Sequence, residues 1–312
     1  MSRYIAVATF LAVLLSSSIA SAQVRNGTVE PVIAEIFVDE PFRGTEGITF
    51  NNEGRLFVAG NRAVWEVTPD GIPRKLVDLD SNLGLAAIGE RDILAADFGP
   101  TNAFRHQRNN DGVVWRITPE GGKTPYITGL GDPNAVVVRA DGSVLVSDDA
   151  TNEIFIFDEQ NGLRLFSTAV NHPNGIVLSH DGKTLYVAQI FKSIRPVIRD
   201  DSLWAIELDA DGNPAPKAPK LVARTGPMAA NDGLEIDKEG RIYIAANGPA
   251  GKVWRYDPVT ENIALIAGDM PGAASLVFGR GSFDHQSLYV TTTFSGGRGG
   301  KVYRVKTDTT GK

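Results

Sequence analysis

The chain has 312 residues and a formal net charge of −6, with 42% hydrophobic and 22% charged residues. This composition can build a globular core and is not that of a disordered chain. The acidic balance, without any basic run, argues against nucleic acid as a partner. The sequence contains no cysteine, which excludes disulfides, a thiol nucleophile and a thiolate metal site.

The first 22 residues predict a secretory signal peptide. Arg3 precedes an apolar run from Ile5 to Leu15, and a small-residue cleavage site, Ala20-Ser21-Ala22, follows. An uncleaved N-terminal anchor is the alternative. No later segment approaches the roughly 18 continuous apolar residues of a spanning helix, so we expect no membrane partner. We expect an exported protein, periplasmic or extracellular in a bacterium, with one mature domain over residues 23–312.

The remainder of the chain repeats one unit six times. Each copy has an apolar strand, a turn that contains glycine, a second strand, and a third strand that ends in a polar turn. In chain order, the copies start at EGITF (46), LAAIG (85), NAVVV (134), NGIVL (174), DGLEI (232) and ASLVF (274). The spacing of roughly 40 to 60 residues is somewhat looser than the ~40–50 residues of a propeller blade.

A fourth strand follows the third in every unit except the last. These strands are expected at 74–79, 124–128, 163–167, 219–223 and 262–267. The strand missing from unit six appears at the other end of the chain, at 32–40. We therefore predict an all-β, six-bladed β-propeller with four-stranded antiparallel blades. The N-terminal strand closes the ring by pairing with 301–307, which removes exposed sheet edges. An open β-sandwich, the alternative, leaves this terminal asymmetry unexplained.

Strand direction predicts which residues share the functional face. Antiparallel strands alternate in direction, so the start of each inner strand and the loop between the second and third strands lie on one face. The six aligned starts are Glu46, Leu83, Asn134, Asn174, Asp232 and Ala274 or Ser275. Four of them carry side-chain oxygen that would converge on the axis.

Carboxylates and amides without sulfur or imidazole form a ligand set for a hard cation such as Ca²⁺. Ca²⁺ takes roughly 6–8 oxygens, so water or substrate must complete the shell. Alternatively, each of these residues has only a local structural role and binds no metal. Asn174-Gly175 and Asp232-Gly233 could be Asx turns with a left-handed backbone, and Glu46 could be a solvated loop carboxylate.

Long loops between second and third strands are expected on the same face, at 98–112, 190–201 and 294–300. Arginines in these loops could bind substrate oxygens, with solvated side chains as the alternative; they are Arg105, Arg108, Arg195, Arg199 and Arg298. His172 lies two residues before Asn174, close to the same site. Four tryptophans at equivalent third-strand positions predict packing between blades rather than carbohydrate platforms; they are Trp65, Trp115, Trp204 and Trp254.

Several segments resemble the regucalcin and gluconolactonase family: EGITF at 46–50, HPNGIVLSHDGKTLYVA at 172–188, ANDGLEIDKEGRIYIA at 230–245, and ASLVFGRGS with SLYVTTT within 274–293. The resemblance implies a six-bladed propeller with one catalytic divalent metal that hydrolyses lactones. By position, Glu46, Asn174 and Asp232 match the metal ligands of the family.

The resemblance also implies roles for single positions. Asn134 matches an asparagine near metal and substrate, and Asp232 matches the acid credited with water activation. Sugar-lactonase members carry an arginine two residues before the asparagine, where this chain has Asp132. This departure argues against a sugar-acid lactone and leaves the substrate open.

We interpret the sequence as a metal-dependent lactone hydrolase. Ca²⁺ is the expected ion, with Zn²⁺, Mn²⁺ or Mg²⁺ as alternatives, and it would polarise the ring carbonyl. Asp232 is the expected catalytic residue. An acid beside a divalent ion has a depressed pKa and is a poor base alone, so Asp148 or His172 could share the proton transfer.

The expected partner is a small lactone or ester, bound by a monomer or weak oligomer. Its expected contacts are Asn134, His172, Asp148, Arg105 and Arg195. Two alternatives remain open. One is an exported, non-enzymatic propeller that binds a ligand or a protein. The other is a family member with an activity other than lactonase.

Overall fold

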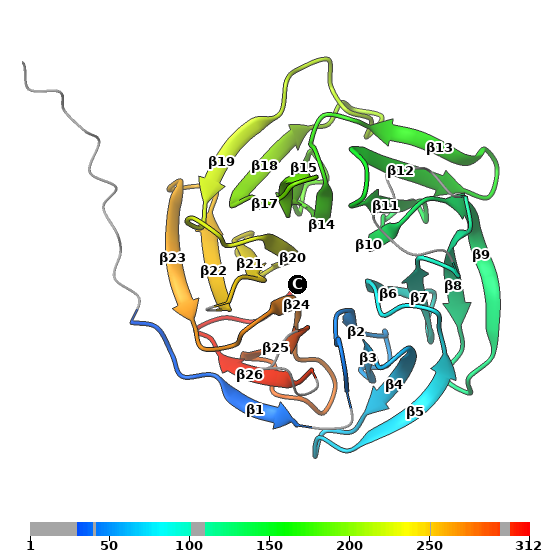
Figure 1. The fold of residues 1–312 in the computed structure, drawn as a ribbon, viewed down its shortest axis with the longest axis vertical. Coiled ribbons are helices and arrows are strands. Elements are labelled where there is room, and N and C mark those ends of the chain that lie inside the picture. The colour runs from blue at the N-terminus through cyan, green and yellow to red at the C-terminus, as the bar shows by residue number, and fades with distance from the viewer. Residues whose placement is uncertain (1–29, 40–41, 101–109, 250, 294–299) are drawn as a thin grey trace, which may run out of the picture.

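The computed structural model describes residues 30–39, 42–100, 110–249, 251–293 and 300–312. Within these ranges the chain is all β, and six four-stranded antiparallel sheets stand as blades in a ring (Figure 1). This confirms the predicted six-bladed propeller. In the described residues, no helix is long and apolar enough to cross a membrane.

The first three blades follow the chain from the innermost strand to the outermost. Blade 1 contains β2 (Ile48–Phe50), β3 (Leu56–Gly60), β4 (Ala63–Val67) and β5 (Pro73–Asp78). Blade 2 contains β6 (Leu85–Ile88), β7 (Asp92–Asp97), β8 (Gly112–Ile117) and β9 (Lys123–Leu130). Blade 3 contains β10 (Pro133–Val138), β11 (Val144–Asp148), β12 (Glu153–Asp158) and β13 (Gly162–Ser167).

The last three blades continue the ring. Blade 4 contains β14 (Pro173–Leu178), β15 (Thr184–Gln189), β18 (Ser202–Glu207) and β19 (Lys220–Arg224). Blade 5 contains β20 (Asn231–Ile236), β21 (Ile242–Ala246), β22 (Lys252–Asp257) and β23 (Asn262–Ala267). Blade 6 contains β24 (Ala273–Phe278), β25 (Ser287–Thr292), β26 (Val302–Lys306) and, outermost, β1 (Glu35–Val38).

The N-terminal strand closes the ring, as predicted. β1 pairs with β26 in an antiparallel ladder that sets Glu35 opposite Arg304 and Ile36 opposite Tyr303. Arg304 donates a hydrogen bond to the Glu35 carboxylate at 2.6 Å. Just before the strand, Val32 forms an isolated parallel bridge with Ala267 of blade 5. The N-terminal segment therefore joins blade 6 to the blade beside it.

The hydrophobic core lies between the blades. One cluster joins Phe57 and Val64 of blade 1 to Leu85 and Ile93 of blade 2, and five further clusters join the other neighbouring pairs. The four tryptophans occupy equivalent third-strand positions and pack against these clusters, which confirms the predicted inter-blade role. This arrangement buries each sheet against its neighbours.

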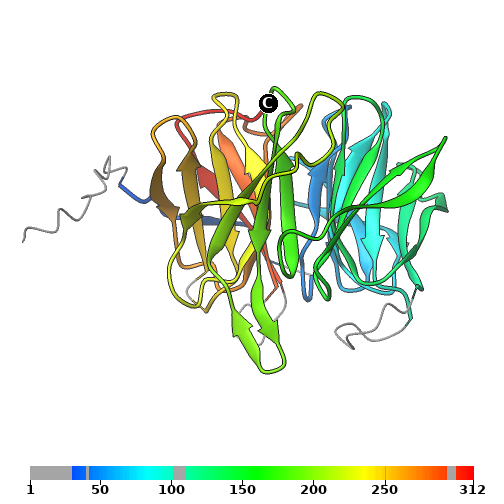
Figure 2. The same ribbon diagram turned by 90° about the horizontal axis from the view of Figure 1, so that it is seen from above.

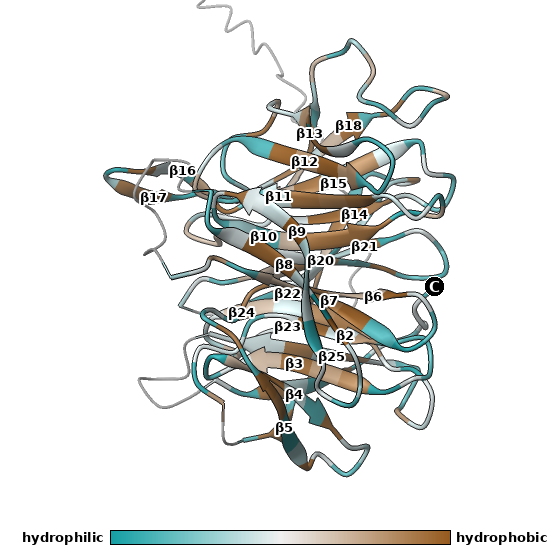
Figure 3. Cartoon of the chain, turned by 90° about the vertical axis from the view of Figure 1, so that its right-hand side faces the viewer, coloured by the Kyte–Doolittle hydropathy of each residue, from teal (hydrophilic) through white to brown (hydrophobic). Residues whose placement is uncertain are grey.

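A short hairpin of β16 (Phe191–Ile194) and β17 (Val197–Arg199) stands out from the ring between β15 and β18. Figure 2 shows it projecting from the face opposite the C-terminus, and Figure 3 shows it standing clear of the stacked strands. Arg195 is exposed in its turn. Arg105, Arg108 and Arg298 lie outside the described residues.

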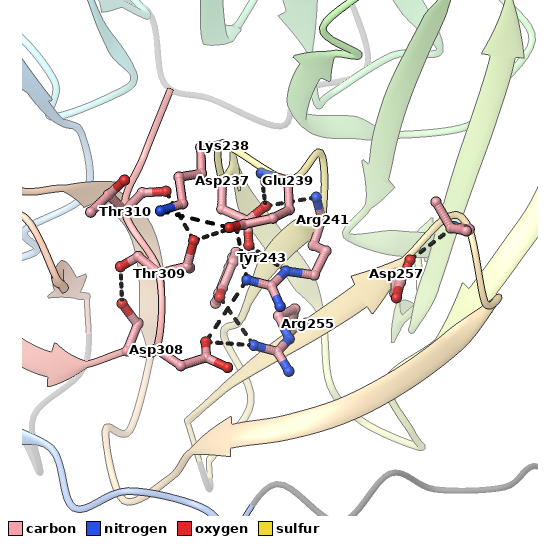
Figure 4. Close-up of polar contacts among 12 residues, drawn as sticks. Asp237, Lys238, Glu239, Arg241, Tyr243, Arg255, Asp257, Asp308, Thr309 and Thr310 are labelled. Atoms are coloured by element: carbon pink, nitrogen blue, oxygen red, sulfur yellow. Dashed lines mark hydrogen bonds and ion pairs between the residues drawn. The ribbon is translucent and has the colours of Figure 1, made fainter.

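On the face where the C-terminus lies, an ion-pair network ties the end of the chain to blade 5 (Figure 4). The Asp237 side chain is fully buried and pairs with Arg241 Nε at 2.6 Å. Arg255 pairs with Asp308 at 2.9 Å. Lys238 N donates to the Thr310 carbonyl at 3.0 Å. We call Asp237, Arg241, Arg255 and Asp308 the paired network.

Candidate functional site

The inner strands surround a central cavity of about 280 Å³. Glu46, Asn134, Asn174 and Asp232 line the end where the inner strands begin, and we call this end the mouth. Glu235 and Arg280 line the other end. The structure therefore brings the four sequence-predicted oxygen donors to one cavity, each from a different blade.

The two remaining blades contribute no carboxylate or amide at their starts. Leu83 of blade 2 is buried. In blade 6, Ser275 lines the cavity, and its backbone N–H donates to the Thr291 hydroxyl at 3.0 Å. The oxygen donors at the strand starts accordingly come from blades 1, 3, 4 and 5.

β-Bulges place three of these donors. In blade 5, Asn231 is opposite Ala246 and Leu234 is opposite Ile244, so Asp232 and Gly233 together face a single residue of β21. Asn134 lies in the same register shift in blade 3, and Asn174 in blade 4. A bulge re-aims a side chain at the end of a strand.

The glycine after the bulged residue serves close packing rather than a turn. A Cβ on Gly233 would lie 2.7 Å from the carbonyl oxygen of Ala274, and one on Gly175 would lie 2.2 Å from that of Asp232. Each glycine thus lets its inner strand approach the start of the next blade. Neither glycine, nor Asn174 or Asp232, has a positive φ, so the left-handed Asx-turn alternative does not hold.

Two amides hold the mouth carboxylates. Asn134 Nδ2 donates to Asp149 Oδ2 at 2.9 Å and to Glu46 Oε1 at 3.4 Å, so it bridges these two acids. Asn247 Nδ2 donates to Asp232 Oδ2 at 2.7 Å. The bridge brings a third carboxylate, Asp149, into contact with the predicted set.

The mouth carboxylates repel one another in a buried setting. Burial raises the pKa of Glu46 to about 7, against the hydrogen bond from Asn134. Burial, and then the charge of Glu46, raise the pKa of Asp149 and of Asp232 well above the ordinary range. Within the described ranges, no lysine, arginine or histidine forms an ion pair with any of the three. The chain itself supplies them with no counter-charge.

Two polar atoms at the mouth have no hydrogen-bond partner although they are buried. They are Asp149 Oδ1 and Asn174 Nδ2, on side chains of residues 3% and 1% exposed. An unsatisfied buried polar group costs about 1–3 kcal/mol, so such atoms indicate a missing partner. The free carboxylate oxygen of Asp149 is a ligand that a hard cation prefers, whereas the Asn174 N–H group needs an acceptor such as water or a substrate oxygen.

The acidic side chains do not already stand at ligand spacing. In the part of the chain that the structure describes, no three His, Asp or Glu side chains are grouped closely enough to hold a metal. The amide of Asn134 lies between Glu46 and Asp149 instead. Binding of a cation would require these side chains to close on it.

Two other predicted residues lie beside the cavity rather than on its wall. Asp148 accepts hydrogen bonds from the backbone N–H groups of Asp132 at 3.1 Å and Ala150 at 3.2 Å, and burial raises its pKa to about 6. His172 Nδ1 lies 2.8 Å from the Asp149 carbonyl. Of the adjacent acids 148 and 149, it is Asp149 that contacts the mouth.

Asp149 and Asn247 were missed by the sequence analysis. Each follows the last residue of the second strand of its blade, two residues beyond the one that faces the bulge. Aligning the ends of the second strands, as well as the starts of the inner strands, would have found both.

Residues 146–294 match the family described as SMP-30/Gluconolactonase/LRE-like region. The chain is 25% identical over 296 residues to a gluconolactonase of Zymomonas mobilis subsp. mobilis, which covers 92% of this chain and 68% of that relative.

Solved structures share the fold. The calcium-binding protein regucalcin from Agrobacterium tumefaciens aligns with a TM-score of 0.70 at 20% identity, over 90% of this chain and 96% of that one. A gluconolactonase from Xanthomonas campestris aligns with a TM-score of 0.67 at 18% identity, over 87% and 88%. A streptogramin B lyase aligns with a TM-score of 0.57 at 14% identity, over 88% and 97%. The fold alone therefore does not decide the chemistry. Together with the family match over residues 146–294, these likenesses confirm that the chain resembles the SMP-30/gluconolactonase-like propellers.

Proposed function

We propose that the protein is a cation-dependent hydrolase that opens a small lactone ring at the mouth of the central cavity. The observation that carries this proposal is the set of buried carboxylates at the mouth, for which no ion-pair partner is present among the described residues. Buried charges without a partner are costly, and protein sites keep them where a ligand or a reaction uses them.

The residues present fit a hard divalent cation. Glu46, Asn174 and Asp232 would hold it, with Ca²⁺ favoured by the all-oxygen donor set and Zn²⁺, Mn²⁺ or Mg²⁺ as alternatives. When bound, such an ion polarises a carbonyl and stabilises the negative charge that develops on its oxygen.

Asp232 is proposed to accept the proton of the attacking water. Its Oδ2 is held by Asn247 at 2.7 Å, which fixes the orientation of the carboxylate. Asn247 is itself held by Thr293 Oγ1, to which its Nδ2 donates at 3.1 Å. This chain of contacts orients Asp232 through neutral groups alone.

His172 is proposed to share the proton transfer. A carbonyl only accepts, so the contact with the Asp149 carbonyl requires Nδ1 to carry the proton in the neutral ring. Nε2 is then left as the proton acceptor. The His172 carbonyl also accepts from Ile190 N at 3.3 Å, which ties this residue to the segment before the hairpin.

The proposed substrate is a small neutral lactone, for which a sugar lactone is the first candidate because relatives are named gluconolactonases. Among the described residues that line the cavity, Arg280 at the far end is the one basic side chain. An anionic lactone would meet the mouth carboxylates without a basic partner there. Asp132, buried and acidic where sugar lactonases are expected to have arginine, argues against a sugar-acid lactone, so lactones that do not derive from sugars are the second candidate.

A lactone panel tests the proposal. The protein is stripped with a chelator, and hydrolysis of neutral five- and six-membered lactones is followed with Ca²⁺, Zn²⁺, Mn²⁺ or Mg²⁺ restored singly. We expect turnover to vanish on stripping and to return with one of these ions. Turnover that survives complete stripping, or no turnover of any lactone with any ion, would contradict it.

We further propose that the protein is exported through the signal peptide predicted at 1–22. N-terminal sequencing of the protein recovered from the periplasm or medium should give a first residue near Gln23.

A further inference from the structure

Asp149 reaches the mouth from a direction that the other donors do not use. Glu46, Asn134, Asn174 and Asp232 lie at the starts of inner strands, whereas Asp149 follows the end of β11, the second strand of blade 3. Its neighbour Asp148, the last residue of β11, accepts hydrogen bonds from the backbone N–H groups of Asp132 and Ala150. Asp149 instead accepts from the Asn134 amide, which also donates to Glu46.

One carboxylate oxygen of Asp149 accepts a hydrogen bond and the other does not. Oδ2 accepts from Asn134 at 2.9 Å. Oδ1 is buried without a partner, on a residue that is 3% exposed. The Asn174 amide, 1% exposed and lining the cavity, is likewise unpartnered through Nδ2. Of these two atoms, only the Asp149 oxygen can ligate a cation, because the Asn174 Nδ2 group is a donor and needs an acceptor.

We propose that Asp149 is a direct ligand of the cation, so that the chain supplies three carboxylates rather than two. This inference rests on the proposed function, because it concerns the same cation. Asn134 would then release its hydrogen bond to Asp149 or Glu46 as the carboxylates close on the ion.

A third carboxylate changes which ions the site prefers. Three formal charges of −1 leave a Ca²⁺ site with a net charge of −1 and a La³⁺ site neutral. Ligand charge count is a main determinant of affinity in oxygen-donor sites. The site should therefore bind La³⁺ more tightly than Ca²⁺, and Asp149 should be responsible for much of that preference.

The experiment compares stripped wild-type protein with Asp149→Asn and Asp149→Ser by calorimetric titration with Ca²⁺ and with La³⁺. Both variants remove the charge, and Asp149→Asn also keeps an acceptor oxygen for Asn134. Asp141→Asn is the control, since Asp141 lies in the turn between β10 and β11 of the same blade, where it accepts from Ser143 and pairs with Arg139 at 3.8 Å. We expect about tenfold or greater weakening for Ca²⁺, a larger loss for La³⁺, and no loss in the control.

Melting of the metal-free proteins separates a ligand from a structural role. Removing one of three repelling buried carboxylates should leave the melting temperature unchanged or raise it. Lower melting temperatures together with weaker binding would show that Asp149 only supports Asn134, and would overturn the proposal. Wild-type affinity in both variants would also overturn it, while leaving the cation site intact. If wild-type protein binds neither ion, the proposed cation site fails and this inference fails with it.

Discussion

Buried acidic side chains on the two faces of the propeller have different kinds of partner. In the paired network, buried Asp237 accepts from Arg241 Nε at 2.6 Å and from the backbone N–H groups of Glu239 and Arg241. At the mouth, Glu46, Asp149 and Asp232 are held by the neutral amides of Asn134 and Asn247. One strand, β20, connects the two regions, with Asp232 near its start and Asp237 just after its end.

This difference in partners indicates that the acids of the paired network stabilise the fold, whereas the acids at the mouth serve function. An acid with an arginine partner and backbone donors has the cost of its burial offset within the chain. The mouth acids have no such offset in the part of the chain that is described, so their burial weakens the metal-free fold. The same feature prepares them to bind a cation. The comparison predicts that mutations in the two regions have opposite consequences for activity and stability.

The largest expected effect follows Asp232→Asn, which keeps the shape of the side chain and removes its charge. Lactone turnover should fall by orders of magnitude, since even outer-shell changes at metal sites cost about 10–100-fold. The metal-free protein should melt near the wild-type temperature. Asp141→Asn, in a true hairpin, should keep full activity; equal turnover in the two variants would contradict the assigned role.

The paired network should respond in the reverse manner. Arg241→Met leaves Asp237 buried without its strongest partner, which should lower the free energy of unfolding by about 1–3 kcal/mol. Turnover at a temperature where the variant is folded should match wild type. Chemical denaturation and steady-state kinetics measure the two quantities. A variant that loses turnover while it keeps its stability would break the comparison.

A smaller effect should follow loss of the hydroxyl that fixes Asn174. Ser147 Oγ donates to the Asn174 carbonyl at 2.7 Å and accepts from Ala135 N at 3.0 Å. Ser147→Ala should cost about 1 kcal/mol of stability and weaken cation binding several-fold without abolishing it. Ser179→Ala removes an exposed hairpin hydroxyl and is the control. Unchanged cation affinity in Ser147→Ala would show that this contact does not position the amide.

The smallest expected effect is a dependence of the stability of the metal-free protein on pH. Burial raises the pKa of Glu46 and of Glu235 from the ordinary value of 4.5 to about 7. The folded metal-free protein therefore keeps protons that the unfolded chain has released, and its stability falls as pH rises from about 4.5 to about 7. Below this window both states are protonated and the penalty is absent.

Glu235→Gln should reduce this dependence and stabilise the metal-free protein at about pH 8, as measured by denaturation across the window. Glu66→Gln is the matched control, because the hydrogen bond from Arg55 lowers the pKa of Glu66. That variant should instead be less stable than wild type at about pH 8. The same sign in both variants would contradict the distinction between unpaired and paired acids.

The blades and their closure could be predicted from sequence because the patterns are regular. Period-2 alternation recurs six times, and the strand missing from unit six lies at 32–40, where β1 forms. The same alignment also brought Glu46, Asn134, Asn174 and Asp232 together at one cavity. Repetition makes a position in one blade informative about its equivalents in the others.

Other parts of the site could not be predicted in this way. A bulge adds one residue to one strand. At Asp232-Gly233 neither residue is apolar, so the alternation of apolar and polar residues does not reveal the added residue. The adjacent side chains of Asp148 and Asp149 have different partners in the structure, the backbone N–H of Asp132 and the Asn134 amide, and the sequence analysis chose Asp148. Arg195 lies in the exposed turn of the hairpin, and its predicted contact with a substrate stays a prediction.

The central claim is that the unpaired acids at the mouth form a cation site and the paired acids do not. Calorimetric titration of stripped protein with Ca²⁺ tests it most directly, with Asp232→Asn for the mouth and Asp308→Asn for the paired network. The account predicts one ion per chain with equal affinity in wild type and Asp308→Asn, and at least about tenfold weaker binding in Asp232→Asn. No binding by wild type, or the same affinity in all three proteins, would contradict it.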